Sequence, residues 1–83
     1  MIGNQALLAV VAVTGIPEAL LKETEGGDDY SAFVSNLTGK TYCVESAWYV
    51  NRLPEEEKKD MQILGEHEGL YVYEQKAWWD GLL

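Results

Sequence analysis

The first pattern along the chain is a run of apolar residues from 6 to 13, bounded by Asn4 and Gly15. Alanine and leucine in this run favour a helix, whereas its valines favour a strand. Because the run is apolar on every side, its periodicity does not choose between them. Asn4 can cap a helix and Gly15 is typical of the residue just past one, so the pattern favours a helix over residues 5–13 and leaves a strand open.

Two prolines precede segments whose polar and apolar positions suit short helices. Pro17 fits a first helical position, and the Gly pair at 26–27 would end that helix. Pro54 fits the same position in a later segment, in which the glutamates at 55–57 match the positive end of the helix dipole. Gly65 would end this helix, so the chain is expected to have three helices in all.

Residues 30–35 and 41–45 are rich in aromatic, small and β-branched residues, which are typical of strands. The short loop between them contains Gly39, which can adopt the positive φ that tight loops require. The two runs therefore predict a β-hairpin.

A third strand is predicted from Leu70 to Glu74, with Leu70 and Val72 on one face and Tyr71 and Tyr73 on the other. The expected fold is one α+β domain over residues 1–83, with element order ααββαβ. It has a small three-stranded antiparallel sheet, two N-terminal helices, and one helix between strands 2 and 3.

Gly39-Lys40-Thr41 matches the end of the phosphate-binding loop G-x-x-x-x-G-K-[ST]. The first glycine of that motif would fall at position 34, which is Val34. The motif should also open a helix, whereas a β-type run follows here, and the chain is too short for the parallel sheet that carries such loops. The tripeptide is therefore interpreted as part of a turn.

The net charge of the chain bears on which kinds of partner it can bind. Six Lys plus Arg face fourteen Asp plus Glu, for a formal net charge of -8. This excess repels phosphate backbones and anionic lipid and attracts basic proteins, although solubility alone could also account for it. We expect no direct nucleic-acid binding and no membrane span, since the apolar run is far shorter than the roughly 20 residues needed. Cys43 is the only cysteine, which favours a reducing, cytoplasmic location.

Candidate catalytic and metal-binding groups are weak. Cys43 and His67 could form a nucleophile and base, but nothing in the sequence places them together. The triplet at 66–68 and the acidic residues within 25–29 lack the ligand spacing of a metal site. Carboxylates among aromatic residues could act as acid or base, the candidates being Glu45, Glu74 and Asp80. We expect no enzyme, no cofactor and no metal.

Aromatic residues are the other prominent feature, with three Trp, five Tyr and one Phe. Six of them are hard to fit together into so small a core: Trp48, Tyr49, Tyr71, Tyr73, Trp78 and Trp79. Either some are exposed as binding anchors or the sheet is packed on both faces.

Size, acidity and the absence of a catalytic motif resemble, as a class, the short inhibitors that phages and mobile elements use against host proteins. Some of these imitate nucleic acid by displaying carboxylates. The first hypothesis is therefore an acidic module that blocks a basic, nucleic-acid-binding surface of a host protein. Its expected binding residues are the six aromatics above and Glu25, Asp28, Asp29, Glu55, Glu56, Glu57 and Asp60. The alternatives are a homo-oligomeric assembly protein, for which a homodimer is possible, and a small metal- or thiol-dependent enzyme.

Overall fold

The secondary structure comes from a computed structural model that describes residues 3–27, 30–59 and 61–75. The chain begins with helix α1 (Gly3–Thr14) and the 3-10 turn η1 (Glu18–Leu20). Strands β1 (Leu21–Gly26), β2 (Tyr30–Ser35) and β3 (Thr41–Ser46) follow. Two single-turn helices, α2 (Ala47–Val50) and α3 (Glu55–Lys58), lead to strands β4 (Gln62–His67) and β5 (Leu70–Glu74).

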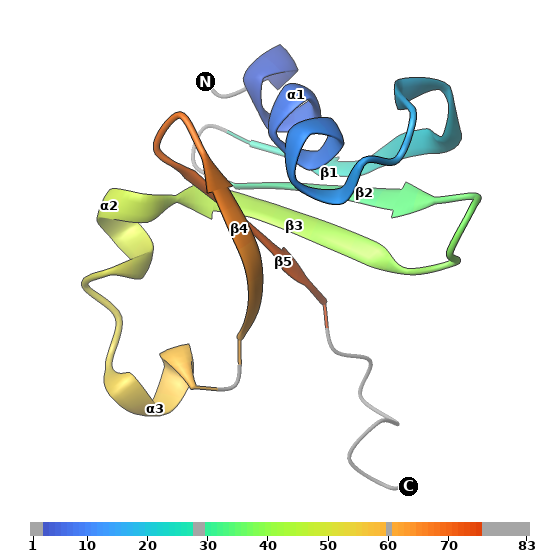
Figure 1. Ribbon diagram of the computed structural model, residues 1–83. Coiled ribbons are helices and arrows are strands. Elements are labelled where there is room, and N and C mark those ends of the chain that lie inside the picture. The colour runs from blue at the N-terminus through green and yellow to red at the C-terminus, as the bar shows by residue number, and fades with distance from the viewer. Residues whose placement is uncertain (1–2, 28–29, 60, 76–83) are drawn as a thin grey trace, which may run out of the picture.

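The strands form one five-stranded sheet in the order β1-β2-β3-β5-β4, with every neighbouring pair antiparallel. Strand β5 therefore lies inside the sheet, although it is the last of the described strands in sequence order. Helix α1 lies across one face, while α2 and α3 lie toward one end of the sheet (Figure 1). The predicted α+β class, the hairpin and the strand over Leu70–Glu74 are confirmed.

The hydrophobic core lies between α1 and the sheet. Ala6, Ala9 and Val10 of α1 are completely buried, because the small alanine side chains let the helix approach the strands closely. The strand residues that pack against them are Phe33, Tyr42, Val44, Leu70 and Val72. On β4, a Cβ added to Gly65 would lie 3.0 Å from Cγ1 of Val13, so the missing side chain leaves room for the helix.

Helix α1 ends as the sequence predicts. Gly15 has φ of +77°, a conformation that glycine adopts without a steric penalty. The Thr14 hydroxyl donates to the Val10 carbonyl at 2.6 Å and accepts from the Ile16 amide at 3.2 Å. The helical alternative for residues 5–13 is thus the correct one.

The helix predicted to begin at Pro17 is wrong. Only one 3-10 turn forms, and the chain continues from Leu21 as strand β1, which pairs with β2. Lysine and glutamate in this segment favour a helix in isolation. The hydrogen bonds offered by the neighbouring strand outweigh that small preference.

The helix predicted from Pro54 to Gly65 is also wrong. It stops after one turn at Lys58, and residues 62–67 form β4. A two-residue turn joins β4 to β5, in which Glu68 and Gly69 have φ of 48° and 82°. Positive φ at both positions defines a type I′ turn, whose twist matches antiparallel strands. The sheet therefore has five strands instead of the predicted three, and the predicted order ααββαβ is wrong.

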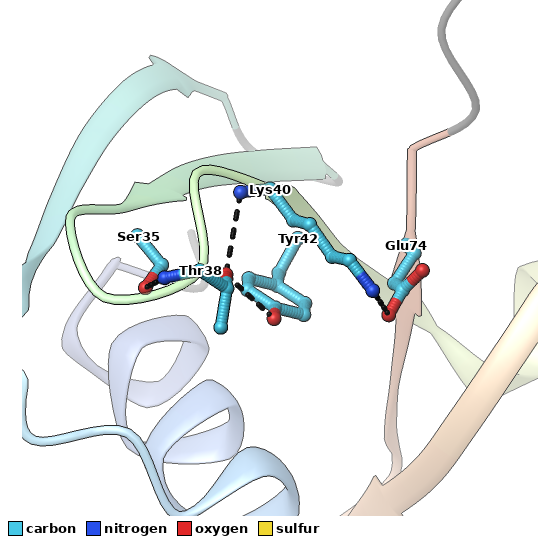
Figure 2. Close-up of polar contacts among 5 residues, drawn as sticks. All are labelled: Ser35, Thr38, Lys40, Tyr42 and Glu74. Atoms are coloured by element: carbon cyan, nitrogen blue, oxygen red, sulfur yellow. Dashed lines mark hydrogen bonds and ion pairs between the residues drawn. The ribbon is translucent and has the colours of Figure 1, made fainter. Parts of the chain in front are cut away.

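Figure 2 shows the turn between β2 and β3. The Ser35 hydroxyl accepts hydrogen bonds from the amides of Leu37 at 3.0 Å and Thr38 at 3.1 Å. Gly39 has φ of +74°. These local bonds hold a tight turn that glycine is well suited to complete.

Lys40 lies beside this turn and reaches across β3 to the end of β5. Its Nζ is 3.2 Å from Oε1 of Glu74 (Figure 2). Thr41 begins strand β3, not a helix, so no helix N-terminus faces the lysine. The interpretation of Gly39-Lys40-Thr41 as part of a turn is confirmed.

Candidate binding surface

The face of the sheet opposite α1, here called the open face, carries a row of tyrosines. Leu70 and Val72 are buried against α1, so Tyr71 and Tyr73 project from the other side, as the sequence predicts. Helix α2 lies at one end of this face, where the Tyr71 hydroxyl donates to Oδ1 of Asn51 at 3.2 Å.

The strand register places one more tyrosine and three glutamates on the same face as Tyr71 and Tyr73. Tyr30, Glu45 and Tyr71 lie in one row across β2, β3 and β5. The same pairings put Glu25 of β1 and Glu66 of β4 on this face. The described residues of the open face are Lys22, Glu25, Tyr30, Ala32, Val34, Thr41, Cys43, Glu45, Ile63, Glu66, Tyr71 and Tyr73. Three of these are glutamates and one is a lysine, so the face is acidic.

At its centre, the open face holds a thiol between two phenols. Cys43 is 1% exposed although α1 lies on the opposite side, because the larger side chains around it exclude water. The Tyr30 hydroxyl and the Cys43 sulfur are hydrogen-bonded at 3.1 Å. The Tyr73 hydroxyl interacts with both the Cys43 thiol and the Glu45 carboxyl.

Burial raises the pKa of all four groups in this cluster. For Tyr30 and Tyr73, the hydrogen-bonded Cys43 sulfur raises the pKa further, and so do the nearby carboxylates, because their charge would repel a phenolate. For Cys43, hydrogen bonds from the two phenols oppose part of the increase. For Glu45, the Tyr73 hydroxyl likewise opposes part of the increase in pKa that burial causes. Cys43 is therefore a protonated, shielded thiol at neutral pH.

We expect Cys43 to resist thiol reagents in the folded protein. The nucleophile in such reactions is the thiolate, and here both its formation and its accessibility are suppressed. Titration with an aromatic disulfide reagent should show negligible labelling in buffer and one equivalent labelled in denaturant. Rapid labelling without denaturant would contradict the buried position of the thiol.

The Cys43–His67 dyad considered from the sequence is not assembled. His67 pairs with Leu70 and thus belongs to the α1 side of the sheet, whereas Cys43 lies on the open face. Across residues 3–27, 30–59 and 61–75, no group of three or more His, Cys, Asp or Glu side chains is arranged to hold a metal ion.

The predicted binding residues are divided between two regions. Tyr71, Tyr73 and Glu25 share the open face. Trp48 and Tyr49 lie on α2 and are 65% and 48% exposed. Glu55, Glu56 and Glu57 lie on α3, which follows α2 along the chain. The other predicted residues lie outside the described part of the chain: Asp28, Asp29, Asp60, Trp78 and Trp79.

Trp48 is held in place despite its exposure. The Arg52 guanidinium carbon lies 3.7 Å from the centroid of the indole, and Nη1 donates to the Trp48 carbonyl at 2.8 Å. This cation–π contact and hydrogen bond already restrict both side chains. The two side chains would therefore lose less conformational entropy when a partner binds.

The α3 glutamates form a weaker acidic feature than the sequence indicates. Glu55 pairs with Lys58 at 3.0 Å. Within residues 47–59, the three glutamates Glu55, Glu56 and Glu57 are balanced by Arg52, Lys58 and Lys59. The net negative charge near tyrosines is therefore greater on the open face than on α3.

Sequence reasoning missed Tyr30 and Glu66 as binding candidates and considered Glu45 only as an acid or base. In the structure Tyr30 lies opposite Glu45 across this hairpin, but the hairpin was predicted without a register, so the sequence did not bring the two residues together. Glu66 was assigned to a loop after the helix predicted to end at Gly65, so the sequence did not place it on the sheet.

Comparison with protein-family models, with curated proteins and with solved structures finds no match for this chain. Among the helices in the described residues, none combines the length and apolar character needed to cross a membrane.

Proposed function

We propose that this chain is a small acidic protein-binding module whose open face docks on a basic surface of another protein. The observation that supports this most is the juxtaposition of Tyr30 and Tyr71 with Glu25, Glu45 and Glu66 on one sheet face. Tyrosines are favoured anchors in interfaces, because a large apolar ring ends in a hydroxyl. Carboxylates around them would steer a basic partner and increase the association rate.

A protein fits this surface better than other ligands do. The net charge of -8 repels nucleic acid and anionic lipid. The recess beside the open face, lined by Glu25, Gly26, Gly27 and Tyr30, is wide open, whereas small-molecule sites usually enclose most of their ligand.

The basic surface is, in this proposal, one that binds nucleic acid. Carboxylates spaced across a sheet can form ion pairs with the Lys and Arg side chains that otherwise contact phosphates. The module would then act as an inhibitor, in the manner of the short acidic proteins of phages and mobile elements.

The experiment is affinity purification from the native host with three baits at two ionic strengths. The test variant is Glu25→Gln with Glu66→Gln, both on the open face. Its matched control is Glu18→Gln with Glu23→Gln, which removes the same number of exposed charges elsewhere. We expect wild type and control to retain a partner at low salt, and the test variant to retain roughly fivefold less, at about 0.5 kcal/mol per rim charge.

Equal recovery with all three baits, or recovery that salt does not change, would argue against the open face as the docking surface. The captured partner is then assayed for nucleic-acid binding with and without the wild-type chain. A partner that binds nucleic acid equally well in both cases would remove the inhibitor part of the proposal and leave the binding module.

A further inference from the structure

Strand β4 is an edge strand whose outer side has no neighbouring strand among the described residues. His67 and Leu70 flank a two-residue type I′ turn, so they form a hydrogen-bonded pair. Pairs alternate along an antiparallel ladder, so Glu66 opposite Tyr71 is a non-hydrogen-bonded pair and Gly65 opposite Val72 a hydrogen-bonded one. A bulge at Leu64 then skips one residue of β4, and Ile63 faces Tyr73 as the next, non-hydrogen-bonded pair. The amide and carbonyl groups of Ile63 and Glu66 point away from β5, toward the free edge.

The two edges of the sheet differ in how they are protected. Strand β1 carries Lys22, Glu23 and Glu25 along its length, and charged side chains discourage a further strand from pairing. Strand β4 instead leaves Ile63 40% exposed and Leu64 45% exposed. Free backbone groups next to exposed apolar side chains are what an added strand requires.

We propose that the outer edge of β4 accepts an extended, basic segment of the partner protein as a sixth strand. This inference rests on the proposed function, because it takes the same basic partner and names how one of its segments is held. The side chains of Ile63 and Glu66 both project on the open face, so the added strand extends that face. A Lys or Arg side chain opposite Glu66 and an apolar one opposite Ile63 would complete the cross-strand pairs.

The edge of β4 could pair with a second copy of this chain or with a basic segment of another protein, and charge favours the second. A second copy of this chain would bring together two molecules that each carry a net charge of -8. A lysine- or arginine-rich segment meets Glu66 and the surrounding acidic face with opposite charge.

The test uses a synthetic eight-residue peptide in which every second residue, all on one face of an extended strand, is lysine or valine in turn, and the residues between them are threonine. The comparison peptide has the same sequence with every second amide N-methylated. Binding is measured by fluorescence anisotropy, and amide chemical shifts locate it. Ile63→Pro removes the outward amide of β4, while Ile63→Ala removes the same side chain and keeps the amide. We expect shifts along residues 62–67, and about fivefold weaker binding of the plain peptide to the proline variant than to the alanine variant, the scale of one or two backbone hydrogen bonds.

N-methylation should weaken binding to the wild-type chain by a similar factor, a result that does not depend on how well any variant folds. Equal binding of the two peptides, or shifts confined to other elements, would overturn strand addition. A wild-type chain that sediments as a dimer, and becomes a monomer with Ile63→Pro, would assign the edge to a second copy instead. If the peptide result is negative while Glu25→Gln with Glu66→Gln still loses the partner, strand addition fails and the proposed function stands.

Discussion

Replacement of Phe33 by alanine is expected to lower the free energy of unfolding by about 3–5 kcal/mol. Phe33 is 3% exposed and lies on the α1 side of β2, within the core formed by α1 and the strands. Removing the ring loses its transfer free energy and leaves a cavity that the helix can only partly close. Since domains of this kind are stable by about 5–15 kcal/mol, the fold would lose a large part of its stability.

Urea denaturation followed by circular dichroism measures this difference. The control is Leu37→Ala in the turn between β2 and β3, where the leucine is 64% exposed and a change within about 0.5 kcal/mol is expected. A Phe33→Ala variant that unfolds at the wild-type urea concentration would show that α1 does not pack on this face of the sheet.

The protein is expected to lose stability steeply above about pH 10. Tyr30, Cys43 and Tyr73 all have pKa values raised in the folded state, chiefly by burial. As the pH rises past their usual pKa values of about 8.5–10, the unfolded chain releases these protons first, and the folded chain retains them. The unfolded state then binds fewer protons, so its free energy falls relative to the folded state, by up to about 1.4 kcal/mol per pH unit for each such group. The ionised Glu45 contributes no slope in this range.

The free energy of unfolding is measured by urea titration at intervals from pH 7 to pH 11. Tyr30→Phe and Tyr73→Phe should each flatten the alkaline decrease, since each removes one retained proton. The same substitution at Tyr49, whose ring is 48% exposed on α2, should leave the decrease unchanged. A curve for the Tyr73→Phe variant that is parallel to wild type would show that this hydroxyl does not lie in the buried cluster.

The parts of the fold that the sequence predicted correctly depend on local signals. The hairpin was evident from two β-type runs around Gly39, and the last strand from the alternation between Leu70 and Glu74. The missed strands, β1 and β4, depend on their neighbours instead. Residues 21–26 have no apolar alternation, and only pairing with β2 makes them a strand. In β4, Gly65 looked like a helix end but is the point where Val13 approaches the sheet.

The candidate surface was predictable to a similar degree. The opposite orientation of Tyr71 and Tyr73 relative to Leu70 and Val72 followed from period-two geometry, and it is the basis of the open face. Which carboxylates accompany those tyrosines depends on strand order. Strand order is not encoded locally. The sequence analysis therefore predicted the three adjacent glutamates of α3 as binding residues and did not predict Glu66. The turn between β4 and β5 gave only a weak clue: Gly69 suits its second position, but Glu68 stands where Asn or Asp is preferred.

The interior position of β5 has a consequence for how the protein is made. While the ribosome has delivered only the residues up to β4, strand β3 has one unpaired edge and β4 has no strand to pair with. Both gaps close together when residues 70–74 emerge, because that one segment bridges them. Until residues 70–74 are synthesised, the intermediate therefore has unpaired strand edges, and any stall just before residue 70 would expose it to aggregation.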